Sequence, residues 1–343
     1  MTQRSADQPV NGADQPVNGE DQPVNGEDQP VNGEDQPMNG AGILARHGLL
    51  AEPAAPPSPV RFPDGAHFRI EIPSVEGPAV LAAVVAEAQA RGITVNRVSQ
   101  GSGAMLLTAA ELAEMARIGA DSGIEVSLFV GPREEWDIGR AAHSDDGPGL
   151  AGRLRGTRQL RYAIDDILRA AEQGIRGFLI ADHGLLQLVA GIQAAGQLPA
   201  SIVWKVSAVL APSNPLSFGV LEQLGGTTIN VPSDLTLGQL AEMRAASSVP
   251  IDLYVETPDW MGGVVRGHEA ADLIRVAAPM YVKFGLRNSR LLYPSGVHLV
   301  DEAVAIATEK VHRAAAAVEW IGRSGMELVQ SGPGAKGLGI PEP

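Results

Sequence analysis

The chain has 343 residues, of which 44% are hydrophobic, and this length and composition allow one large core or two smaller ones. A formal net charge of -14 argues against a nucleic-acid-binding surface, and the absence of cysteine excludes disulfides, thiolate-bound zinc and cysteine-ligated iron–sulfur clusters. The first ten residues lack the apolar core of a signal peptide, and no run approaches the roughly 20 apolar residues of a membrane span. We therefore expect a soluble, cytoplasmic protein with no membrane partner.

The N-terminal region is a tandem repeat of the heptapeptide DQPVNGE. Its five copies open at Asp7, Asp14, Asp21, Asp28 and Asp35. Pro and Asn-Gly in every copy exclude a continuous helix, so the repeats are predicted to be disordered. With the Pro-rich segment that follows, which is predicted to be a stiff linker, they form the region 1–62 that precedes the barrel. A solvated, passive tail is one interpretation. The other is a docking arm, because identical copies raise the effective concentration at a protein partner.

From residue 66 onward the pattern alternates between strands and helices. The predicted strands are 68–74, 94–100, 125–131, 177–183, 201–207, 227–233, 251–257 and 280–286. Helical patterns such as 78–92, 109–123 and 161–174 lie between them, and a last helix is expected from about His298 to Gly322. Eight alternations in roughly 260 residues match an α/β fold of the (β/α)8 TIM-barrel type at 66–325, followed by a flexible tail at 326–343. A doubly wound sheet is the alternative architecture, because spacing alone does not establish closure.

Most of the predicted strands end in polar or charged residues. Parallel strands covered on both faces are normally apolar throughout, and barrel enzymes place their chemistry at the C-terminal mouth. Because residues two apart share a face, the polar residues form one inward-facing set. Asp182 and His183 are adjacent, so one of them faces the interior and the other the rim. The candidate catalytic residues are Glu71, Asp182, His183, Lys205, Asn230, Glu256 and Lys283, and the candidate substrate-binding residues are Arg97, Ser207, Trp260 and Arg287.

These residues suit three kinds of chemistry: metal binding, Schiff-base formation and acid–base catalysis. The alternative is a purely structural role, in which paired charges fill the barrel. Glu71, Glu256, Asp182 and His183 carry the oxygen and imidazole ligands that a divalent cation would need. Lys205 or Lys283 would form a Schiff base if burial lowered its pKa, and carboxylates with lysines also suit acid–base work. The long connection at 132–157 is a candidate lid.

The stretch LYVETPDWMGGVVRGHEAADLIRVAAPMYVKFGLRNSRLLYPSGVHL, at 253–299, resembles the C-terminal part of the collagenase-like peptidases of family U32, whose catalytic type is unassigned. The resemblance implies a barrel fold and a nominal peptidase or hydrolase activity. Other members of that family take part in oxygen-independent hydroxylation with a cysteine-bound iron–sulfur cluster, which this chain cannot ligate. No peptidase nucleophile or metal motif accompanies the resemblance.

The leading hypothesis is accordingly a U32 peptidase-like barrel enzyme that acts on a small or peptide-like substrate at the mouth. The alternatives are an aldolase- or lyase-type barrel enzyme that uses Lys205 or Lys283, and a non-catalytic barrel scaffold with the repeats as its docking arm.

Overall fold

In the computed structural model, residues 40–48, 54–132 and 152–343 are described, and the chain forms two compact units, Met1–Ala51 and Glu52–Pro343. In the first unit the described residues form helix α1 (Gly40–Arg46). The heptapeptide repeats up to Asn39 lie outside the described residues, as does most of the predicted lid loop. The second unit carries the candidate site.

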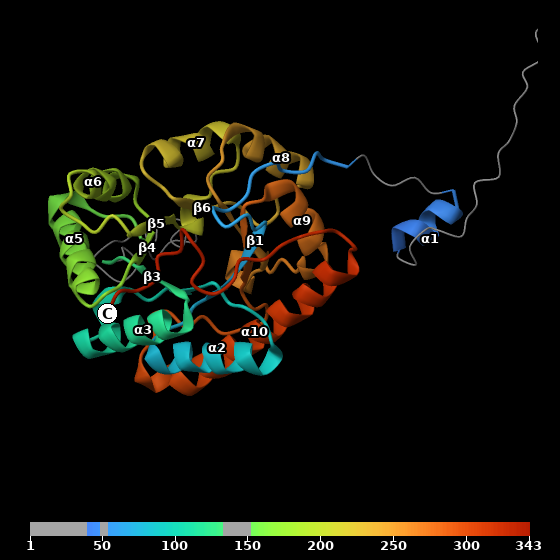
Figure 1. The fold of residues 1–343 in the computed structure, drawn as a ribbon. Helices are drawn as coiled ribbons and strands as arrows, with labels where there is room; N and C mark the ends of the chain where they lie inside the picture. The colour runs from blue at the N-terminus through green and yellow to red at the C-terminus, as the bar shows by residue number, and fades with distance from the viewer. Residues whose placement is uncertain (1–39, 49–53, 133–151) are drawn as a thin grey trace, which may run out of the picture. The chain divides into compact units, whose positions relative to one another are not determined.

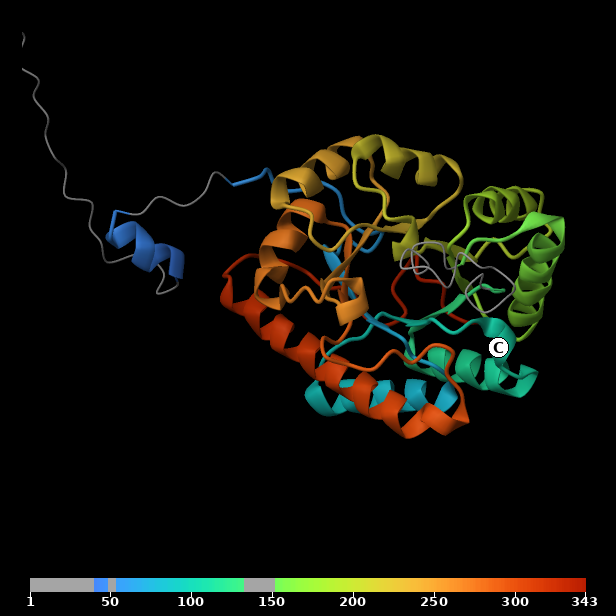
Figure 2. The same cartoon turned by 180° about the vertical axis from the view of Figure 1, so that it is seen from behind.

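Eight parallel strands of the second unit close into a barrel (Figures 1 and 2). They are β1 (Phe68–Pro73), β2 (Arg97–Gln100), β3 (Glu125–Phe129), β4 (Gly177–Ile180), β5 (Val203–Val206), β6 (Thr228–Asn230), β7 (Ile251–Glu256) and β8 (Met280–Phe284). Each strand pairs with the next in chain order, and β8 pairs with β1. The predicted (β/α)8 barrel is therefore confirmed, and the doubly wound alternative is wrong.

Helices cover the outer face of the barrel (Figures 1 and 2). They are α2 (Pro78–Arg91), α3 (Ala109–Ser122), α5 (Gly156–Glu172), α6 (His183–Ala194), α7 (Pro215–Gln223), α8 (Leu237–Ala246), α9 (Ala270–Ala277) and α10 (Val300–Arg323). The last helix, α10, lies beside α2 and also contacts β1 and β8. This packing places side chains of α10 next to the two strands that close the barrel.

Local sequence signals set the helix boundaries. One of them also explains why the fourth strand, β4, ends earlier than predicted. Helix α3 begins with a capping box between Thr108 and Glu111, and it ends at Gly123, whose φ of 63° suits glycine. The predicted fourth strand reached residue 183, but β4 ends at Ile180 because Asp182 already caps α6. Polar residues after a strand therefore divide into those that face the interior and those that start the next helix.

The segment after α10 packs across the N-terminal end of the barrel, where Figure 1 shows it in red. The guanidinium of Arg69 donates to the Lys336 carbonyl at 2.7 Å and to the Ser331 hydroxyl at 3.0 Å. The backbone N–H of Gly339 donates to Glu125 Oε2 at 3.0 Å. These contacts were not anticipated for a segment whose sequence predicts a flexible tail. They cover one end of the barrel, so a ligand would enter at the other.

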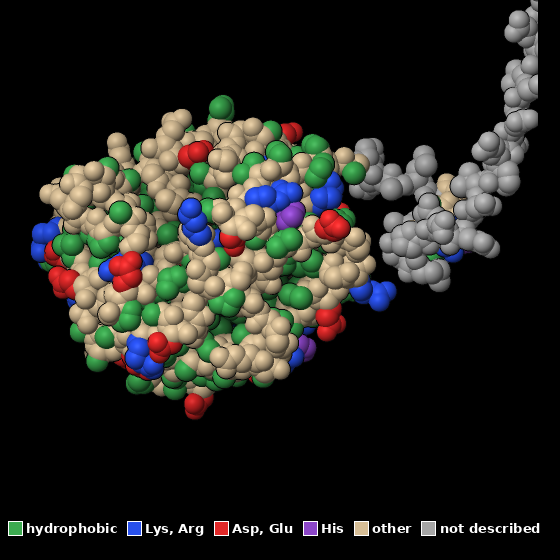
Figure 3. All heavy atoms as spheres, in the orientation of Figure 1, with side chains coloured by type: hydrophobic (Ala, Val, Ile, Leu, Met, Phe, Trp, Pro, Cys, Tyr) green, Lys and Arg blue, Asp and Glu red, His purple; other side chains and the backbone are tan. Residues whose placement is uncertain are grey.

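The distribution of charged side chains on the surface and the hydropathy of the helices can be compared with what the composition of the chain predicts. On the face drawn in Figure 3, Lys and Arg side chains lie among Asp and Glu side chains instead of gathering into one basic area. No helix in the described ranges is both long enough and apolar enough to span a membrane.

Candidate active site at the mouth of the barrel

A buried carboxylate, that of Glu71 on β1, organises the interior of the barrel. Its Oε2 accepts a hydrogen bond from Arg97 Nε at 2.8 Å. Its Oε1 accepts from Ser99 Oγ at 2.7 Å, contacts the ammonium of Lys205, and lies 3.5 Å from Nζ of Lys283. Burial alone would raise the pKa of Glu71, but Arg97, Lys205 and Lys283 together hold it well below its usual range. Glu71 is therefore an ionised anchor for three cations.

Strand register explains why these residues meet. Glu71 is level with Arg97 on one neighbouring strand and with Lys283 on the other, while Asn230 is level with Asp252. Residues at equivalent heights of a closed barrel point into one layer of its interior. Of the sequence-predicted candidates, the structure brings Glu71, Arg97, Lys205, Asn230 and Lys283 together.

Two further carboxylates complete this layer, and the sequence analysis missed both. Asp252 Oδ2 accepts from Arg97 Nη2 at 2.6 Å and from the Thr228 hydroxyl at 3.2 Å. Glu125 Oε1 lies 3.5 Å from Arg97 Nη1. Both residues stand near the starts of their strands, whereas the search for candidates concentrated on strand ends. The same two-residue alternation that selects Glu256 as inward-facing also selects Asp252, four residues earlier.

The two interior lysines differ in their access to solvent. Lys205 is fully buried beneath Glu71, and burial lowers its pKa to about 7 in spite of the carboxylate. Lys283 donates to Asn230 Oδ1 and lies 4.0 Å from the centroid of the Tyr254 ring. Burial lowers its pKa as well. Lys283 reaches a cavity, whereas Lys205 does not line it.

The lysine content itself carries a signal that the sequence analysis did not use. The chain has four lysines among its 26 basic residues, namely Lys205, Lys283, Lys310 and Lys336. The first three are buried, and only Lys336 is exposed. Arginine supplies the remaining positive charge. Because arginine keeps its charge at any accessible pH and lysine does not, the buried lysines are the basic groups that can lose a proton near neutrality.

A cavity of about 70 Å³ opens at the C-terminal mouth, and we name it the Lys283 cavity. Lys283, Asn230 and Ser99 line it from the barrel interior. Its remaining lining includes Ser207, Tyr254, Trp260 and Tyr293. Since roughly 10–15 Å³ of such space accommodates one water molecule, the cavity has room for a small ligand group beside Lys283.

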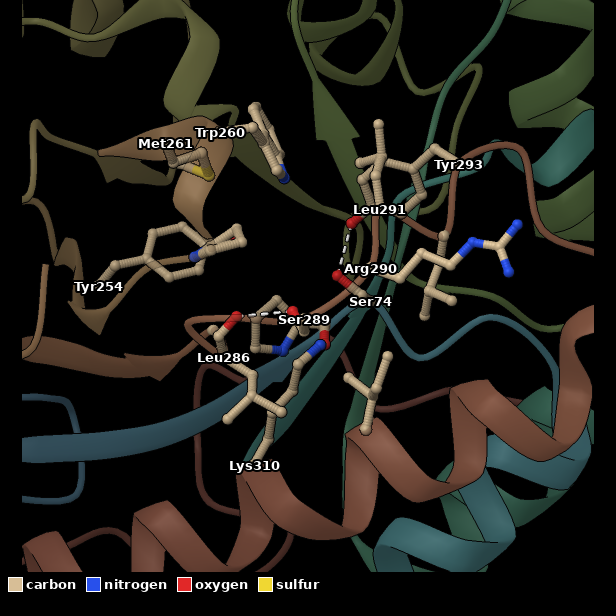
Figure 4. A pocket seen from close by; sticks show the side chains of 15 residues that line it. Ser74, Tyr254, Trp260, Met261, Leu286, Ser289, Arg290, Leu291, Tyr293 and Lys310 are labelled. Atoms are coloured by element: carbon tan, nitrogen blue, oxygen red, sulfur yellow. Dashed lines mark hydrogen bonds between the residues drawn. The ribbon is translucent and has the colours of Figure 1, made fainter. Parts of the chain in front are cut away.

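A second cavity of about 30 Å³ adjoins the first, and we name it the Lys310 cavity (Figure 4). It lies between the loops that follow β7 and β8, with Lys310 of α10 in its lining. The two cavities share the wall formed by Pro73, Ser74, Tyr254, Trp260, Met261 and Tyr293. On this wall the hydroxyls of Ser74 and Tyr293 are 2.5 Å apart.

The remaining predicted residues take other places. Asp182 is the N-cap of α6, accepting from the backbone N–H of Leu185 at 2.9 Å. His183 is the first residue of that helix and is exposed, with Nδ1 3.2 Å from Arg153 Nη1. Neither residue belongs to β4, so the expectation that one of them faces the interior from this strand is wrong. Asp182 and His183 follow β4 closely because they cap and begin helix α6.

The side chain of Glu256 does not join the interior layer, because β7 contains an irregularity between Tyr254 and Glu256. Tyr254 is level with Lys283, but Glu256 is level with Phe284, which is one residue later instead of two. The Glu256 carboxylate accepts from the backbone N–H of Arg287 at 3.0 Å and lies 3.7 Å from Arg313 Nε of α10. The prediction that Glu256 points inward with Tyr254 fails at this bulge.

The proposed metal ligands are thus distributed over separate surroundings. Glu71 binds cations inside the barrel, Glu256 lies against α10, and Asp182 caps a helix. Within the described ranges, no group of three or more His, Cys, Asp or Glu side chains is arranged to hold a metal ion. Arg287 is exposed, with Nε 3.5 Å from Asp259 Oδ1. It does not line either cavity.

Comparisons with known proteins give likenesses of fold. No protein-family model and no curated protein matches the chain. Among solved structures, the U32 peptidase Mk0906 is 18% identical, with 58% of this chain and 72% of that chain covered and a TM-score of 0.38. A protein from Coccidioides immitis assigned as a fructose-1,6-biphosphate aldolase is 12% identical, with 75% and 92% covered and a TM-score of 0.46. The carboxyl transferase domain of Rhizobium etli pyruvate carboxylase is 10% identical, with 75% and 48% covered and a TM-score of 0.40.

Proposed function

We propose that this barrel is a lyase-type enzyme in which Lys283 forms an imine with the carbonyl group of a small substrate. The observation that carries the proposal is the position of Lys283, which lines the mouth cavity although its side chain is buried in the barrel interior.

 The exposed fraction of Lys283 is 2%, so its amine is shielded from bulk water although the residue lines the cavity. Shielding of this kind favours the neutral amine that attacks a carbonyl carbon.

The chemistry follows from the groups around this amine. Nζ of neutral Lys283 would form a bond to the carbonyl carbon, and the carbonyl oxygen would leave as water after taking one proton from Nζ and one from solvent. The resulting protonated imine withdraws electrons from the adjacent carbon, so that a neighbouring C–C or C–H bond can break. Asn230 Oδ1 accepts from Nζ and orients it, and the ring of Tyr254 covers one side of it. Glu71, 3.5 Å away, would stabilise the positive charge of the imine nitrogen.

A neighbouring cation supports this role. A second cationic group close to a lysine lowers the pKa of its amine and so favours the nucleophilic form. The charge of Arg97 acts in this way on the pKa of Lys283. Lys205 contacts the same Glu71 oxygen, but it does not line the cavity. We therefore assign imine formation to Lys283.

A peptidase mechanism, which the resemblance to family U32 implies, would need an activated nucleophile in the same cavity. Ser99 lines this cavity, and its Oγ donates to Oε1 of Glu71, which lies outside the lining, at 2.7 Å. However, the three cations hold the pKa of Glu71 well below its usual range, and a carboxylate with so low a pKa is a weak general base. The geometry therefore supports lysine chemistry better than peptide hydrolysis.

Reductive trapping tests the proposal. The full chain is incubated near neutral pH with pyruvate, 4-oxopentanoate or glyceraldehyde, then reduced with sodium borohydride and mapped by peptide mass spectrometry. We expect an adduct at Lys283 that is absent in Lys283→Met, while Lys336→Gln, a change at the exposed lysine, retains it. Circular dichroism establishes that each variant is folded. Adducts confined to Lys336 or the terminal amine would refute imine formation, and release of peptide fragments that needs Ser99 would favour the hydrolase.

A further inference from the structure

The linings of both mouth cavities are positively charged, although the whole chain carries a formal net charge of -14. Among the described residues, the charged side chain in the Lys283 cavity is Lys283, and those in the Lys310 cavity are Lys310 and Arg290. No described carboxylate lines either one. A cavity of this charge selects against cations and favours an anionic ligand group.

Lys310 is the buried charge of the second cavity. It is 3% exposed, and its Nζ donates to the Pro73 carbonyl at 2.8 Å. An ammonium group has three donors, so the hydrogen bond to the Pro73 carbonyl does not exhaust the capacity of Lys310. Arg290 is exposed and points away from Lys310 in Figure 4, and its Nη1 lies 3.2 Å from Glu302 Oε2. The charge aimed at a ligand in this cavity is therefore that of Lys310.

Two acidic residues act on Lys310 from outside the cavity lining. Glu76 accepts from the backbone N–H groups of Gly101 at 2.8 Å and Ser102 at 3.1 Å. Glu256 accepts from the backbone N–H of Arg287. Both acids attract Lys310 electrostatically, but burial still lowers the pKa of Lys310 to about 8. An anion in the cavity would stabilise its protonated form.

The size and position of the cavity narrow the class of anion. About 30 Å³ of space equals two or three times the roughly 10–15 Å³ that one water molecule needs, which suits the two oxygens of a carboxylate better than a phosphate group. The hydroxyl of Ser289 and that of Ser74 lie in the same lining. In barrel enzymes, the loops after the seventh and eighth strands frequently form a phosphate-binding site, so an anion site at this position has a precedent in the fold.

We propose that the Lys310 cavity binds the carboxylate of an oxo acid whose carbonyl group lies beside Lys283 in the adjoining cavity. The substrate class depends on the imine chemistry proposed above, but the anion site does not. Ser74, Tyr254 and Tyr293 line both cavities and would contact the middle of the substrate. Lys310 would act as a binding and positioning residue, and Lys283 as the reacting one.

The first experiment compares a charged probe with its neutral counterpart. 4-Oxopentanoate and 4-oxopentanamide differ in the carboxylate alone, and pyruvate tests a shorter spacing. We expect Lys310→Met to raise the half-saturating concentration of 4-oxopentanoate for borohydride trapping at Lys283 by about tenfold, the usual effect of losing a charged hydrogen bond, and to leave that of the amide unchanged. Lys336→Gln is the control. Equal effects on acid and amide would overturn the carboxylate assignment.

A second experiment measures binding on the unmodified protein and uses a variant only to assign a signal. With four lysines in the chain, [13C-ε]lysine labelling gives four side-chain signals, and Lys310→Met identifies that of Lys310. Propionate is expected to shift this signal and to raise the pKa read from it, whereas propionamide leaves it in place. A larger response to inorganic phosphate than to propionate would refute the carboxylate, and no response to either would refute the anion site.

The two proposals fail in different ways. If Lys310 responds to propionate but no probe is trapped at Lys283, the anion site stands and the imine proposal is wrong. If acid and amide are trapped equally well at Lys283 in both proteins and the Lys310 signal does not respond, the imine proposal stands and the anion site is wrong.

Discussion

Lys205 and Lys283 share one carboxylate oxygen: Lys205 contacts Glu71 Oε1 from within the barrel, and Nζ of Lys283 lies 3.5 Å from the same atom. The layer around them holds three carboxylates, those of Glu71, Glu125 and Asp252, and three cations, since Arg97 joins the two lysines. Buried charges of this kind are tolerated when each has a partner and become costly when one partner is removed.

Replacing Glu71 with glutamine should therefore destabilise the fold strongly. The change leaves Arg97, Lys205 and Lys283 facing fewer negative charges, and loss of one partner from a buried ion pair costs about 3–5 kcal/mol. Urea denaturation measures the free energy of unfolding. The double variant E71Q/K205M should recover part of the loss, because it removes a cation together with its carboxylate.

The matched control is Glu114→Gln on α3, where the Arg117 ion pair is exposed to solvent. We expect no measurable change there, because exposed pairs contribute little. Equal effects of the two substitutions would show that the interior layer does not depend on its charge pairing.

Stability should rise with pH from about pH 7 to about pH 10. Lys205 has a folded pKa of about 7 against an ordinary value of 10.5, so in this interval the unfolded chain binds more protons than the folded chain. Its contribution is complete above the unfolded pKa and is lost as pH falls to the folded pKa. Lys310, with a pKa of about 8, adds a contribution of the same sign. Each fully displaced proton corresponds to about 1.4 kcal/mol per pH unit.

The variant Lys205→Met tests this dependence. Its unfolding free energy, measured by urea denaturation at several pH values, should rise less steeply over this interval than that of the original protein, with Lys336→Gln as the unaffected control. Parallel profiles for the original protein and K205M would contradict a lowered pKa at Lys205. Above pH 10 the interpretation changes, because burial raises the pKa of Tyr254 and Tyr281, and the unfolded chain then releases protons first.

Gly101 should be required for the position of Tyr293 at the shared wall. A Cβ atom at Gly101 would lie 2.3 Å from the Tyr293 ring, which is far inside van der Waals contact. Gly101→Ala should therefore displace the ring and cost about 1–3 kcal/mol, as overpacking usually does. The double variant G101A/Y293A should recover most of that stability in thermal or urea unfolding.

Gly191 on α6 provides the comparison, since a Cβ atom there meets nothing within 4 Å. Gly191→Ala should stabilise the protein by up to about 1 kcal/mol, because alanine favours the helix. If G101A behaved like G191A, the close packing of Tyr293 against Gly101 would be refuted.

Trp260 should report occupation of the mouth. It lines both cavities and is 46% exposed, while Trp320 on α10 is 52% exposed and lines neither. We expect 4-oxopentanoate to reduce acrylamide quenching of tryptophan fluorescence in the original protein and in Trp320→Phe, but not in Trp260→Phe. Protection that persists in W260F would place the ligand elsewhere.

The barrel and much of its interior could be predicted from the sequence because strand and helix periodicities are local. Eight strand patterns predicted a barrel, whose closure the structure confirmed, and alternation along each strand selected Glu71, Arg97, Lys205, Asn230 and Lys283 as inward-facing. Asp252 and Glu125 obey the same alternation and were missed because attention was given to strand ends. The inward direction of these side chains follows from alternation along each strand and does not depend on contacts between segments far apart in sequence.

Other features depend on tertiary structure. A single irregularity in β7 turns Glu256 toward α10, and a helix cap accounts for Asp182, although both residues follow the same strand-end pattern as Lys283. The access of Lys283 to the mouth, the burial of Lys205 and the approach of Lys310 from a helix near the end of the chain are set by packing between segments far apart in sequence. Burial and neighbouring charge determine the pKa of a lysine, and neither is encoded by its local sequence.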